Sequence, residues 1–267
     1  MCYVKAVGCF GFVFFSSIVL AASLGDVTGY GFSDFRSAYY TRGKIVNKDP
    51  ILPLYGQGIC SLGPAGYLGG SVWAVNAVSC GGQSADRQNA FHEVDLKPFY
   101  GYAWDFGNGW ALDNRIARQW VLLPGYRTHP PTIDEWQVSQ ELRNPFVTPY
   151  YLMRHAFDDY DWTYWCVGLK RTFVLGGGLS LRPGVWCDLG DSGHFKSQYG
   201  RSCSDGLMAL NGELRLEWWF CTHVAAYSAV QQYGVVSRSG RDALQSSSAV
   251  QSVTDLTIFT IGIAARF

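Results

Sequence analysis

Residues 254–267 read TDLTIFTIGIAARF, and this stretch decides the fold class. Every second residue shares one face, and that face is mostly apolar. A period of two is the side-chain repeat of a β-strand and differs from the 3.6-residue repeat of a helix. The residues on this face are Thr257, Phe259, Ile261, Ile263, Ala265 and Phe267. The stretch therefore predicts a strand with one apolar face and an aromatic end.

The same alternation recurs along the chain and predicts about twelve strands. In the clearest of them, Leu214 and Leu216 alternate with Arg215 and Glu217. Alternation of this kind is typical of sheets whose two faces meet different surroundings. The predicted spans are 30–40, 54–62, 66–77, 92–106, 109–123, 134–143, 150–157, 161–174, 178–188, 207–220, 222–232 and 255–267. The faces of 66–77, 150–157 and 222–232 stay ambiguous.

Composition excludes several classes of protein. Only 16% of the 267 residues are charged, and a charged fraction below the ~25% of soluble domains argues against disorder. The net charge is zero, so there is no general basis for a nucleic-acid partner. Beyond residue 23 no stretch approaches the ~18 to 20 apolar residues that a membrane-spanning helix needs.

The first 25 residues have the pattern of a secretory signal peptide. A single lysine precedes an apolar stretch at residues 6–22, and small residues follow it. Cleavage after Ser23 or after Gly25 satisfies the small-x-small rule. The alternative is an uncleaved anchor, but no basic stop-transfer cluster follows. We predict a cleaved signal peptide at 1–25 and a barrel domain at 26–267.

The connections between predicted strands fall into two alternating sets. The short ones lie near 62–65, 107–108, 144–149, 175–177 and 220–222, and the long ones at 41–53, 77–91, 124–133, 189–206 and 233–254. Only 158–160 breaks this rule. A soluble sandwich also alternates, but short turns at one end and long loops at the other are typical of outer-membrane barrels.

The predicted fold is therefore all-β, a closed antiparallel up-and-down transmembrane β-barrel of about 12 strands. Lipid offers no hydrogen-bond partners, so an open sheet edge is excluded and the first and twelfth strands should pair. Aromatic residues near the short turns predict a girdle at the membrane interface, with core packing as the alternative. They are Tyr67, Phe106, Trp110, Phe146, Phe173, Trp218, Trp219, Phe220 and Phe267.

The polar faces supply the candidate functional residues. A charge on the lipid side in mid-membrane costs ~2 to 4 kcal/mol, so these side chains are expected to line the lumen. The predicted pore-lining residues are Asp34, Arg36, Glu93, Asp95, Lys97, Asp113, Arg115, Glu135, Glu141, Arg143, Arg182, Glu213, Arg215 and Glu217. Arg118 falls on the nominal lipid face of its strand, which suggests a bulge or a shift of register there.

The C-terminal stretch and the signal peptide together resemble bacterial outer-membrane β-barrel proteins, whose last strand ends in Phe. That resemblance implies a bacterial outer-membrane location and recognition by the barrel-assembly machinery through Phe259, Ile261, Ile263 and Phe267. More loosely, the chain resembles TorF-type porins and related barrels. The stretches that carry this likeness are SDFRSAYYTRGKIVNKDPILP (33–53), GYLGGSVWAVNAVS (66–79), HEVDLKPFYGYAWDFGNGW (92–110) and LGGGLSLRPGVWCDLG (175–190).

Eight cysteines are present, and six remain after removal of the signal peptide. Outside the cytoplasm thiols oxidise more often than they bind metal, so a loop disulfide between Cys187 and Cys203 is predicted, although sequence cannot determine the pairing. The spacing of Cys187, His194 and Cys203 matches no compact zinc pattern. No metal site is predicted.

No catalytic residues or cofactor are predicted. The chain lacks the G-x-S-x-G motif of a nucleophile elbow. A hydrolase remains a hypothesis only if a serine hydroxyl lies within hydrogen-bond reach of His155 or His223. The leading functional prediction is an outer-membrane, porin-like channel for passive diffusion of small hydrophilic solutes, with outer-membrane lipid as its other partner. The alternative is a closed structural or surface-binding barrel without transport.

Overall fold

The computed structural model describes eight segments of the chain: residues 27–47, 49–77, 93–122, 132–157, 161–199, 206–238, 241–242 and 254–267. The predicted signal peptide at 1–25 lies outside these segments, so its cleavage stays a prediction. Among the described residues, no helix combines the length and apolarity needed to cross a membrane.

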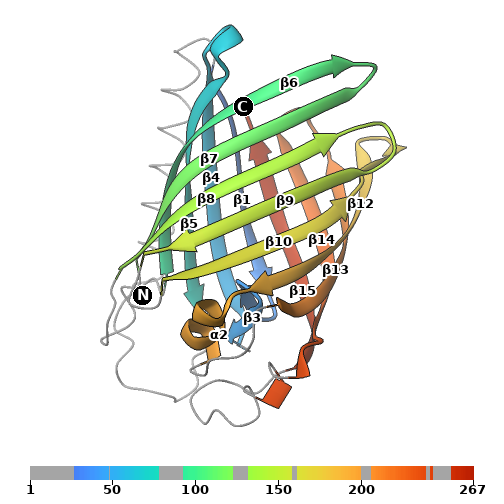
Figure 1. Ribbon diagram of the computed structural model, residues 1–267. Helices are drawn as coiled ribbons and strands as arrows, with labels where there is room; N and C mark the ends of the chain where they lie inside the picture. Colours follow the sequence, from blue (N-terminus) through green and yellow to red (C-terminus); the bar gives the residue numbers. More distant parts are fainter. Residues whose placement is uncertain are drawn as a thin grey trace, which may run out of the picture.

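Twelve antiparallel strands close into a ring, which confirms the predicted fold class (Figure 1). Most predicted spans agree with the observed ones to within three residues at either end. The spans 30–40 and 161–174 run four residues too far, because the chain leaves the ring after Arg36 and after Lys170. The strands of the ring are β1 (Val27–Arg36), β4 (Ile51–Ser61), β5 (Tyr67–Ala77), β6 (Glu93–Gly107), β7 (Trp110–Leu122), β8 (Thr132–Arg143), β9 (Thr148–Ala156), β10 (Trp162–Lys170), β12 (Leu179–Gly190), β13 (Gly206–Trp219), β14 (Val224–Val235) and β15 (Asp255–Arg266).

Five smaller elements lie outside this ring. The strands β2 (Tyr39–Thr41) and β3 (Lys44–Asn47) pair with each other in the connection between β1 and β4. Strand β11 (Phe173–Gly176) pairs with β12 beyond the end of β10. A 3-10 turn, η1 (Gly63–Ala65), joins β4 to β5, and helix α2 (Ser192–Tyr199) follows β12.

The ring closes where the first and last strands meet, as predicted. Strand β1 pairs with β15 from Tyr30 opposite Arg266 to Arg36 opposite Thr260. Beyond this ladder, the backbones of Gly29 and Phe267 exchange hydrogen bonds of 3.0 and 3.1 Å. A Cβ on Gly29 would lie 1.9 Å from the Phe267 ring, so a larger residue there would displace the ring.

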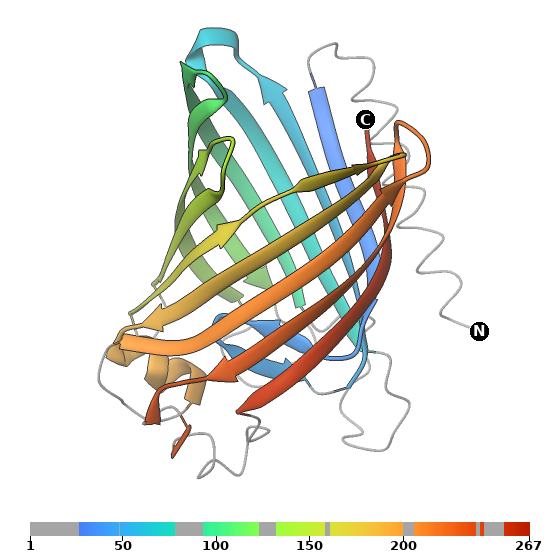
Figure 2. The ribbon, with the colours of Figure 1, turned by 90° about the vertical axis from the view of Figure 1, so that its right-hand side faces the viewer.

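The two ends of the barrel differ as the connection lengths predict (Figures 1 and 2). Short connections at 62–66, 108–109, 144–147, 177–178 and 220–223 lie at the end that holds the C-terminus. We call this the short-turn end. The other end, which we call the loop end, carries α2 and the β2–β3 hairpin, and β9 ends and β10 begins there.

The outer wall is apolar. Phe259, Ile261 and Ile263 of β15 are each about 60% exposed, whereas the alternate residues Ile258 and Ala264 are buried. The pattern of buried and exposed residues also assigns the faces of the three ambiguous strands, with Ala74 of β5 as an exception that is buried on the outer face. Inward-facing residues are Ser71 and Val75 of β5, Ala156 of β9, and Ala225, Tyr227, Ala229 and Tyr233 of β14.

Two expectations about the outer wall were wrong. Strand β7 runs in continuous register with β8, so there is no bulge at Arg118. Its guanidinium faces outward and binds both oxygens of Asp134 on β8, at 2.5 and 3.0 Å. Because Asp134 neutralises its charge, Arg118 can remain on the outer wall without a shift of register.

In the girdle, Phe106, Phe146 and Trp218 are exposed as predicted.

Tyr67 and Trp219 depart from the predicted girdle because carboxylates hold them. The Tyr67 hydroxyl donates to Asp113, and the indole N–H of Trp219 donates to Glu217 at 2.6 Å. Both carboxylates are buried, and burial without hydrogen bonds would be costly.

Candidate functional site: the charged interior of the barrel

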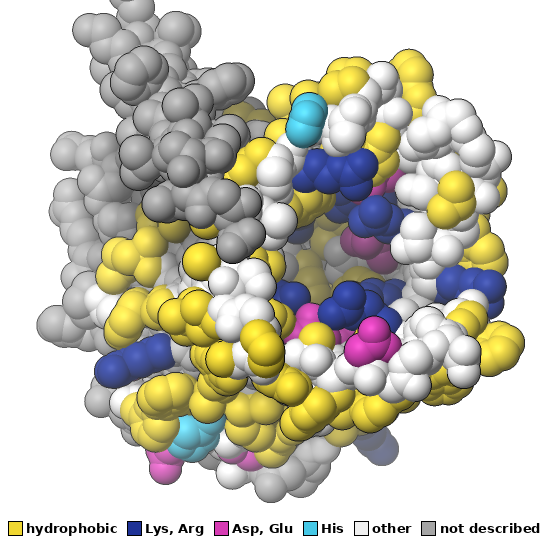
Figure 3. Space-filling model, turned by 90° about the horizontal axis from the view of Figure 1, so that it is seen from above, with side chains coloured by type: hydrophobic (Ala, Val, Ile, Leu, Met, Phe, Trp, Pro, Cys, Tyr) yellow, Lys and Arg dark blue, Asp and Glu magenta, His cyan; other side chains and the backbone are white. Residues whose placement is uncertain are grey.

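Charged side chains gather inside the ring. Viewed from the short-turn end, Lys, Arg, Asp and Glu side chains surround a hollow, and apolar side chains form most of the rim (Figure 3). The two-residue period of each strand is the reason, because it turns alternate residues to opposite faces. The predicted pore-lining residues fall into groups at the short-turn end, the middle and the loop end.

The first group at the short-turn end surrounds Asp113 of β7. Its carboxylate binds Arg115 at 3.1 Å and Arg143 at 3.2 Å, and it accepts the Tyr67 hydroxyl. The Arg115 Nε donates to the Tyr67 oxygen at 2.7 Å. The Arg115 guanidinium also lies 5.5 Å from the centre of the Phe99 ring, within cation–π range.

The second group surrounds Glu217 of β13. Arg215 lies 2.7 Å and Arg182 2.9 Å from its oxygens, and the carboxylate is fully buried. A buried carboxylate requires such partners, because an uncompensated charge is expensive to remove from water. Nearby on β8 and β10, Glu141 and Lys170 form a more exposed pair at 2.5 Å.

The middle group centres on Asp34 of β1. Arg36 binds both of its oxygens at 2.9 and 3.0 Å, and the Tyr227 hydroxyl donates to it at 2.6 Å. The Arg36 guanidinium lies 5.1 Å from the centre of the Trp73 ring. Glu213 is half-buried and interacts electrostatically with Arg36 and with Arg215.

The loop-end group is the most buried. Glu93, Asp95 and Glu135 are all buried. Asp95 accepts a hydrogen bond of 2.6 Å from Gln119, and Glu135 lies 2.9 Å from Arg42 and 3.7 Å from Arg154. Lys97 belongs to the same group and interacts electrostatically with Asp95, Glu135 and Arg154.

The β2–β3 hairpin reaches from the first connection into this group. Tyr39 donates to Glu93 of β6 at 2.8 Å, and Arg42 reaches Glu135 of β8. On other sides of the ring, Tyr40 donates to Asp188 of β12, and Tyr233 of β14 donates at 2.9 Å to the carbonyl of Gly43. Strands β6 and β14 are far apart in the ring order, so the hairpin crosses the lumen at the loop end.

The turn of this hairpin explains its shape. Arg42 has φ of 50° and Gly43 has φ of 85°, the left-handed conformations that tight two-residue hairpin turns need. Burial and the neighbouring Asp188 carboxylate raise the pKa of Tyr40 well above its usual value, so its hydroxyl keeps its proton and donates.

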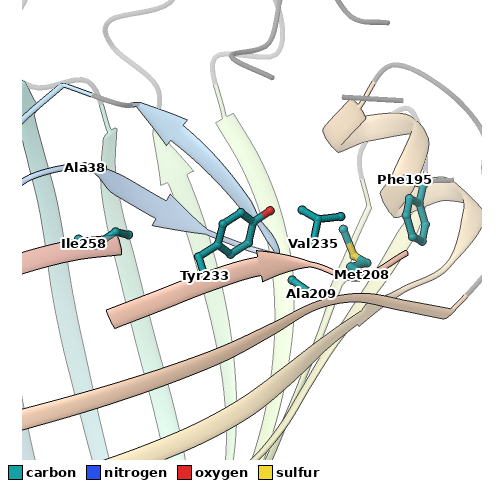
Figure 4. Close-up of a cluster of buried hydrophobic side chains, with 7 residues drawn as sticks. All are labelled: Ala38, Phe195, Met208, Ala209, Tyr233, Val235 and Ile258. Atoms are coloured by element: carbon teal, nitrogen blue, oxygen red, sulfur yellow. The ribbon is translucent and has the colours of Figure 1, made fainter. Parts of the chain in front are cut away.

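Helix α2 supports the hairpin from the loop end. Asp191 caps the helix by accepting the His194 backbone N–H at 2.7 Å. The His194 ring is buried, and its Nε2 lies 3.0 Å from the Arg42 carbonyl oxygen. Beside it, an apolar cluster joins α2, the wall and the chain before the hairpin, and it comprises Ala38, Phe195, Met208, Ala209, Tyr233, Val235 and Ile258 (Figure 4).

Sequence reasoning missed the residues that hold the hairpin in place. Tyr39, Tyr40 and Arg42 lie in or beside what was expected to be an outer loop, and Asp188 was assigned no role. One signal was available. The Arg42–Gly43 dipeptide lies between the stretch Tyr-Tyr-Thr (39–41) and the stretch Lys-Ile-Val (44–46), and aromatic and β-branched residues on both sides of a glycine-containing turn are typical of a short hairpin.

The histidines raised as hydrolase candidates have other partners. His155 Nδ1 lies 3.1 Å from a threonine hydroxyl, that of Thr163, and its Nε2 lies 3.2 Å from Asp161. His223 Nδ1 lies 3.1 Å from the carbonyl oxygen of Arg266. No serine hydroxyl bonds either ring in the part of the chain that the structure describes.

Metal ligation and disulfide formation were the remaining candidates for chemistry. Within the described segments, no group of three or more His, Cys, Asp or Glu side chains is arranged to hold a metal ion. Cys187 lies in β12 with its Sγ 3.5 Å from the Val167 carbonyl oxygen. Cys203 lies outside the described residues, so the predicted disulfide stays a prediction.

Comparisons with known proteins identify the fold but no family. No family model matches the chain, and no curated protein matches it, so the looser likeness to TorF-type porins also stays a prediction. Among solved structures, the NanC porin has a TM-score of 0.51 at 8% identity, over 90% of this chain and 98% of that one.

Two other solved structures are similar to the same degree. An outer membrane channel from Pseudomonas putida F1 has a TM-score of 0.50 at 10% identity, over 90% of this chain and 94% of that one. Outer membrane phospholipase A from Escherichia coli, in an active-site variant, has a TM-score of 0.50 at 15% identity, over 89% of each chain. The chain therefore has the fold of an outer-membrane β-barrel.

Proposed function

We propose that this protein is a porin-like channel of the bacterial outer membrane that lets small hydrophilic solutes diffuse through passively. One observation carries the proposal: charged side chains surround a hollow inside a ring whose outer wall is apolar (Figure 3). A twelve-stranded ring is wider than the eight-stranded kind that side chains alone fill. The predicted pore-lining residues, from Asp34 to Glu217, would contact the passing solute.

The fold supports this proposal. Two of the similar structures are described as a porin and as an outer membrane channel. One is a phospholipase, so the fold by itself allows enzymes. We propose a non-enzymatic role because the described carboxylates inside the barrel are engaged by structural donors, which are arginine, lysine, glutamine, asparagine, tyrosine and tryptophan side chains. Export by the predicted signal peptide would bring the chain to its membrane.

The hairpin favours a second candidate function, a closed barrel with a structural or surface-binding role. Its hydrogen bonds to Glu93 and Asp188 and its ion pair with Glu135 connect different sides of the lumen at the loop end. A hairpin held in this way narrows a channel, and in the extreme it closes one. The two functions differ in a single measurable property, which is ion conduction.

Recording from planar bilayers tests the channel. Purified protein refolded into the bilayer is expected to give discrete conductance steps in potassium chloride, because water and ions would fill the charged hollow. An empty refolding mixture serves as the control. A refolded, heat-modifiable protein that inserts without conductance steps would support the closed barrel instead.

We also propose that the barrel-assembly machinery recognises the C-terminal strand through Phe259, Ile261, Ile263 and Phe267. Phe259, Ile261 and Ile263 occupy every second position of β15 and are prominently exposed, and Phe267 follows directly after the strand. Deletion of Phe267 is expected to reduce the amount of folded barrel in outer-membrane fractions severalfold, with a smaller effect on refolding into detergent. Ala265→Ser, on the same face, is the matched control. Equal membrane levels of the deletion variant and the parent would refute this role.

A further inference from the structure

The walls of the lumen are nearly neutral in composition, but their accessible surface is not. Acidic and basic side chains occur inside the ring in similar numbers, which by itself predicts little preference between ions of opposite sign. What a solute meets, however, depends on which member of each ion pair is exposed. In most of the described pairs, the basic side chain has a larger exposed fraction than the acidic one.

In the middle and at the short-turn end, each arginine that binds a buried acid is more exposed than that acid. The difference is smallest for Arg215 and Glu217, at 17% against 0%. The Arg143 side chain is 52% exposed, against 8% for its partner Asp113. Arg182 is 42% exposed over a fully buried Glu217. Arg36 is 25% exposed, against 1% for Asp34.

The side chains themselves explain this layering. Each carboxylate is short and is held against the wall by a neutral donor as well as by arginine. The donors are Tyr67 for Asp113, Tyr227 for Asp34 and Trp219 for Glu217. Arginine is longer, and its stem covers the acid while its planar head reaches past it. Rings of Trp73 and Tyr227 lie 5.1 Å from Arg36 and 3.6 Å from Arg215 and help to fix the guanidinium planes.

Three acids depart from the pattern and limit its strength. Asp105 lies on the inner face of β6 at the short-turn end and is exposed, and it accepts the Gly107 N–H at 2.8 Å. Glu141 is 33% exposed beside Lys170, which is 48% exposed, so that pair presents both charges. Glu213 is half-buried near Arg215. The exposed groups that remain are mainly guanidinium N–H donors. Guanidinium matches the planar oxygens of carboxylate and phosphate better than an ammonium does.

We propose that the lumen selects anions, and among them solutes that carry a carboxylate or phosphate group. The inference rests on the proposed channel function and specifies its substrate class. Buried carboxylates act as anchors that hold the arginines in place. The arginines supply the surface that an anion contacts.

The reversal potential of the refolded protein in a gradient of potassium chloride tests ion selectivity. Chloride is expected to permeate about threefold better than potassium at low salt, with the preference shrinking as salt screens the lumen. The double variant Arg143→Gln/Arg182→Gln should bring the ratio close to one. Arg118→Gln, which makes the same chemical change on the outer wall, should leave it unchanged.

Each outcome separates the inference from the function on which it rests. Conductance with equal or cation-favouring permeability would overturn the inference alone, whereas the absence of conductance would overturn the channel and the inference together. If the double variant does not refold, Arg143→Gln alone should shift the ratio in the same direction by less, because Arg143 is the most exposed of these arginines.

Inorganic phosphate tests the preference for oxyanions. Millimolar phosphate added to potassium chloride should reduce the current through the parent channel more than through Arg143→Gln/Arg182→Gln. An equal reduction in both would overturn the assignment of the guanidinium groups as the binding surface.

Discussion

Replacing residues 39–47 with a Gly-Ser segment of equal length is expected to raise single-channel conductance at least about twofold, because a twelve-stranded wall encloses a bore that side chains alone do not fill. The hairpin formed by these residues crosses that bore at the loop end. Its contacts reach β6, β8, β12 and β14, so it lies between opposite walls.

A second variant keeps the hairpin but removes two of its contacts with the barrel wall. Tyr40→Phe/Arg42→Gln deletes the donor to Asp188 and the charge beside Glu135. This variant should show noisier current with frequent transitions to a larger conductance. The matched control, Tyr151→Phe/Arg118→Gln, makes the same two chemical changes on the outer wall. Retention of heat-modifiable mobility on a gel would verify that each barrel is folded.

Unchanged conductance in the Gly-Ser variant would mean that the hairpin does not limit the bore. The narrowest point would then lie among the arginines of the short-turn end. If the parent protein does not conduct but the Gly-Ser variant does, the hairpin is the element that closes the barrel.

The second large effect concerns stability. Glu217→Gln is expected to lower the free energy of unfolding by about 3 kcal/mol or more, the usual cost of breaking a buried ion pair by removing one partner. Glu217 is fully buried and binds Arg182, Arg215 and the Trp219 indole. The variant would leave two guanidinium groups without their shared counter-charge.

Glu141→Gln is the matched control for this change. Glu141 and Lys170 are both partly exposed, and a solvent-exposed pair contributes about 1 kcal/mol or less. Urea unfolding of the protein in lipid vesicles, followed by tryptophan fluorescence, measures both variants. Equal losses of stability would contradict the view that burial makes the Glu217 cluster structurally important.

The amino-acid sequence predicted the strands well because the wall of a barrel is a local structure. Whether Ile261 or Arg215 faces lipid depends only on its parity within a strand, and lipid penalises errors of parity strongly. The exception at Arg118 is instructive. A charge can remain on the outer wall when a neighbouring strand supplies Asp134, and the sequence does not show which residues lie opposite one another.

The interior was harder to predict for the same reason. Asp113 and Arg143 were both placed on the inner face, but their contact joins β7 to β8, and that of Glu217 with Arg182 joins β13 to β12. Which member of each pair is buried depends on neighbours such as Tyr67 and Trp219. These two aromatic residues were expected at the membrane interface.

The twelve strands of the ring, their approximate spans, the alternation of short and long connections and the two chemically different faces can all be read from the amino-acid sequence, because they follow from a side-chain repeat of two and from the absence of water in lipid. The inward position of the hairpin at 39–47 and the covering of carboxylates by guanidinium groups are properties of the folded ring. The position of the hairpin depends on partners more than fifty residues apart, such as Tyr39 with Glu93 and Arg42 with Glu135. The covering of the carboxylates depends on contacts between neighbouring strands, such as that of Asp113 with Arg143, which form only when the strands pair.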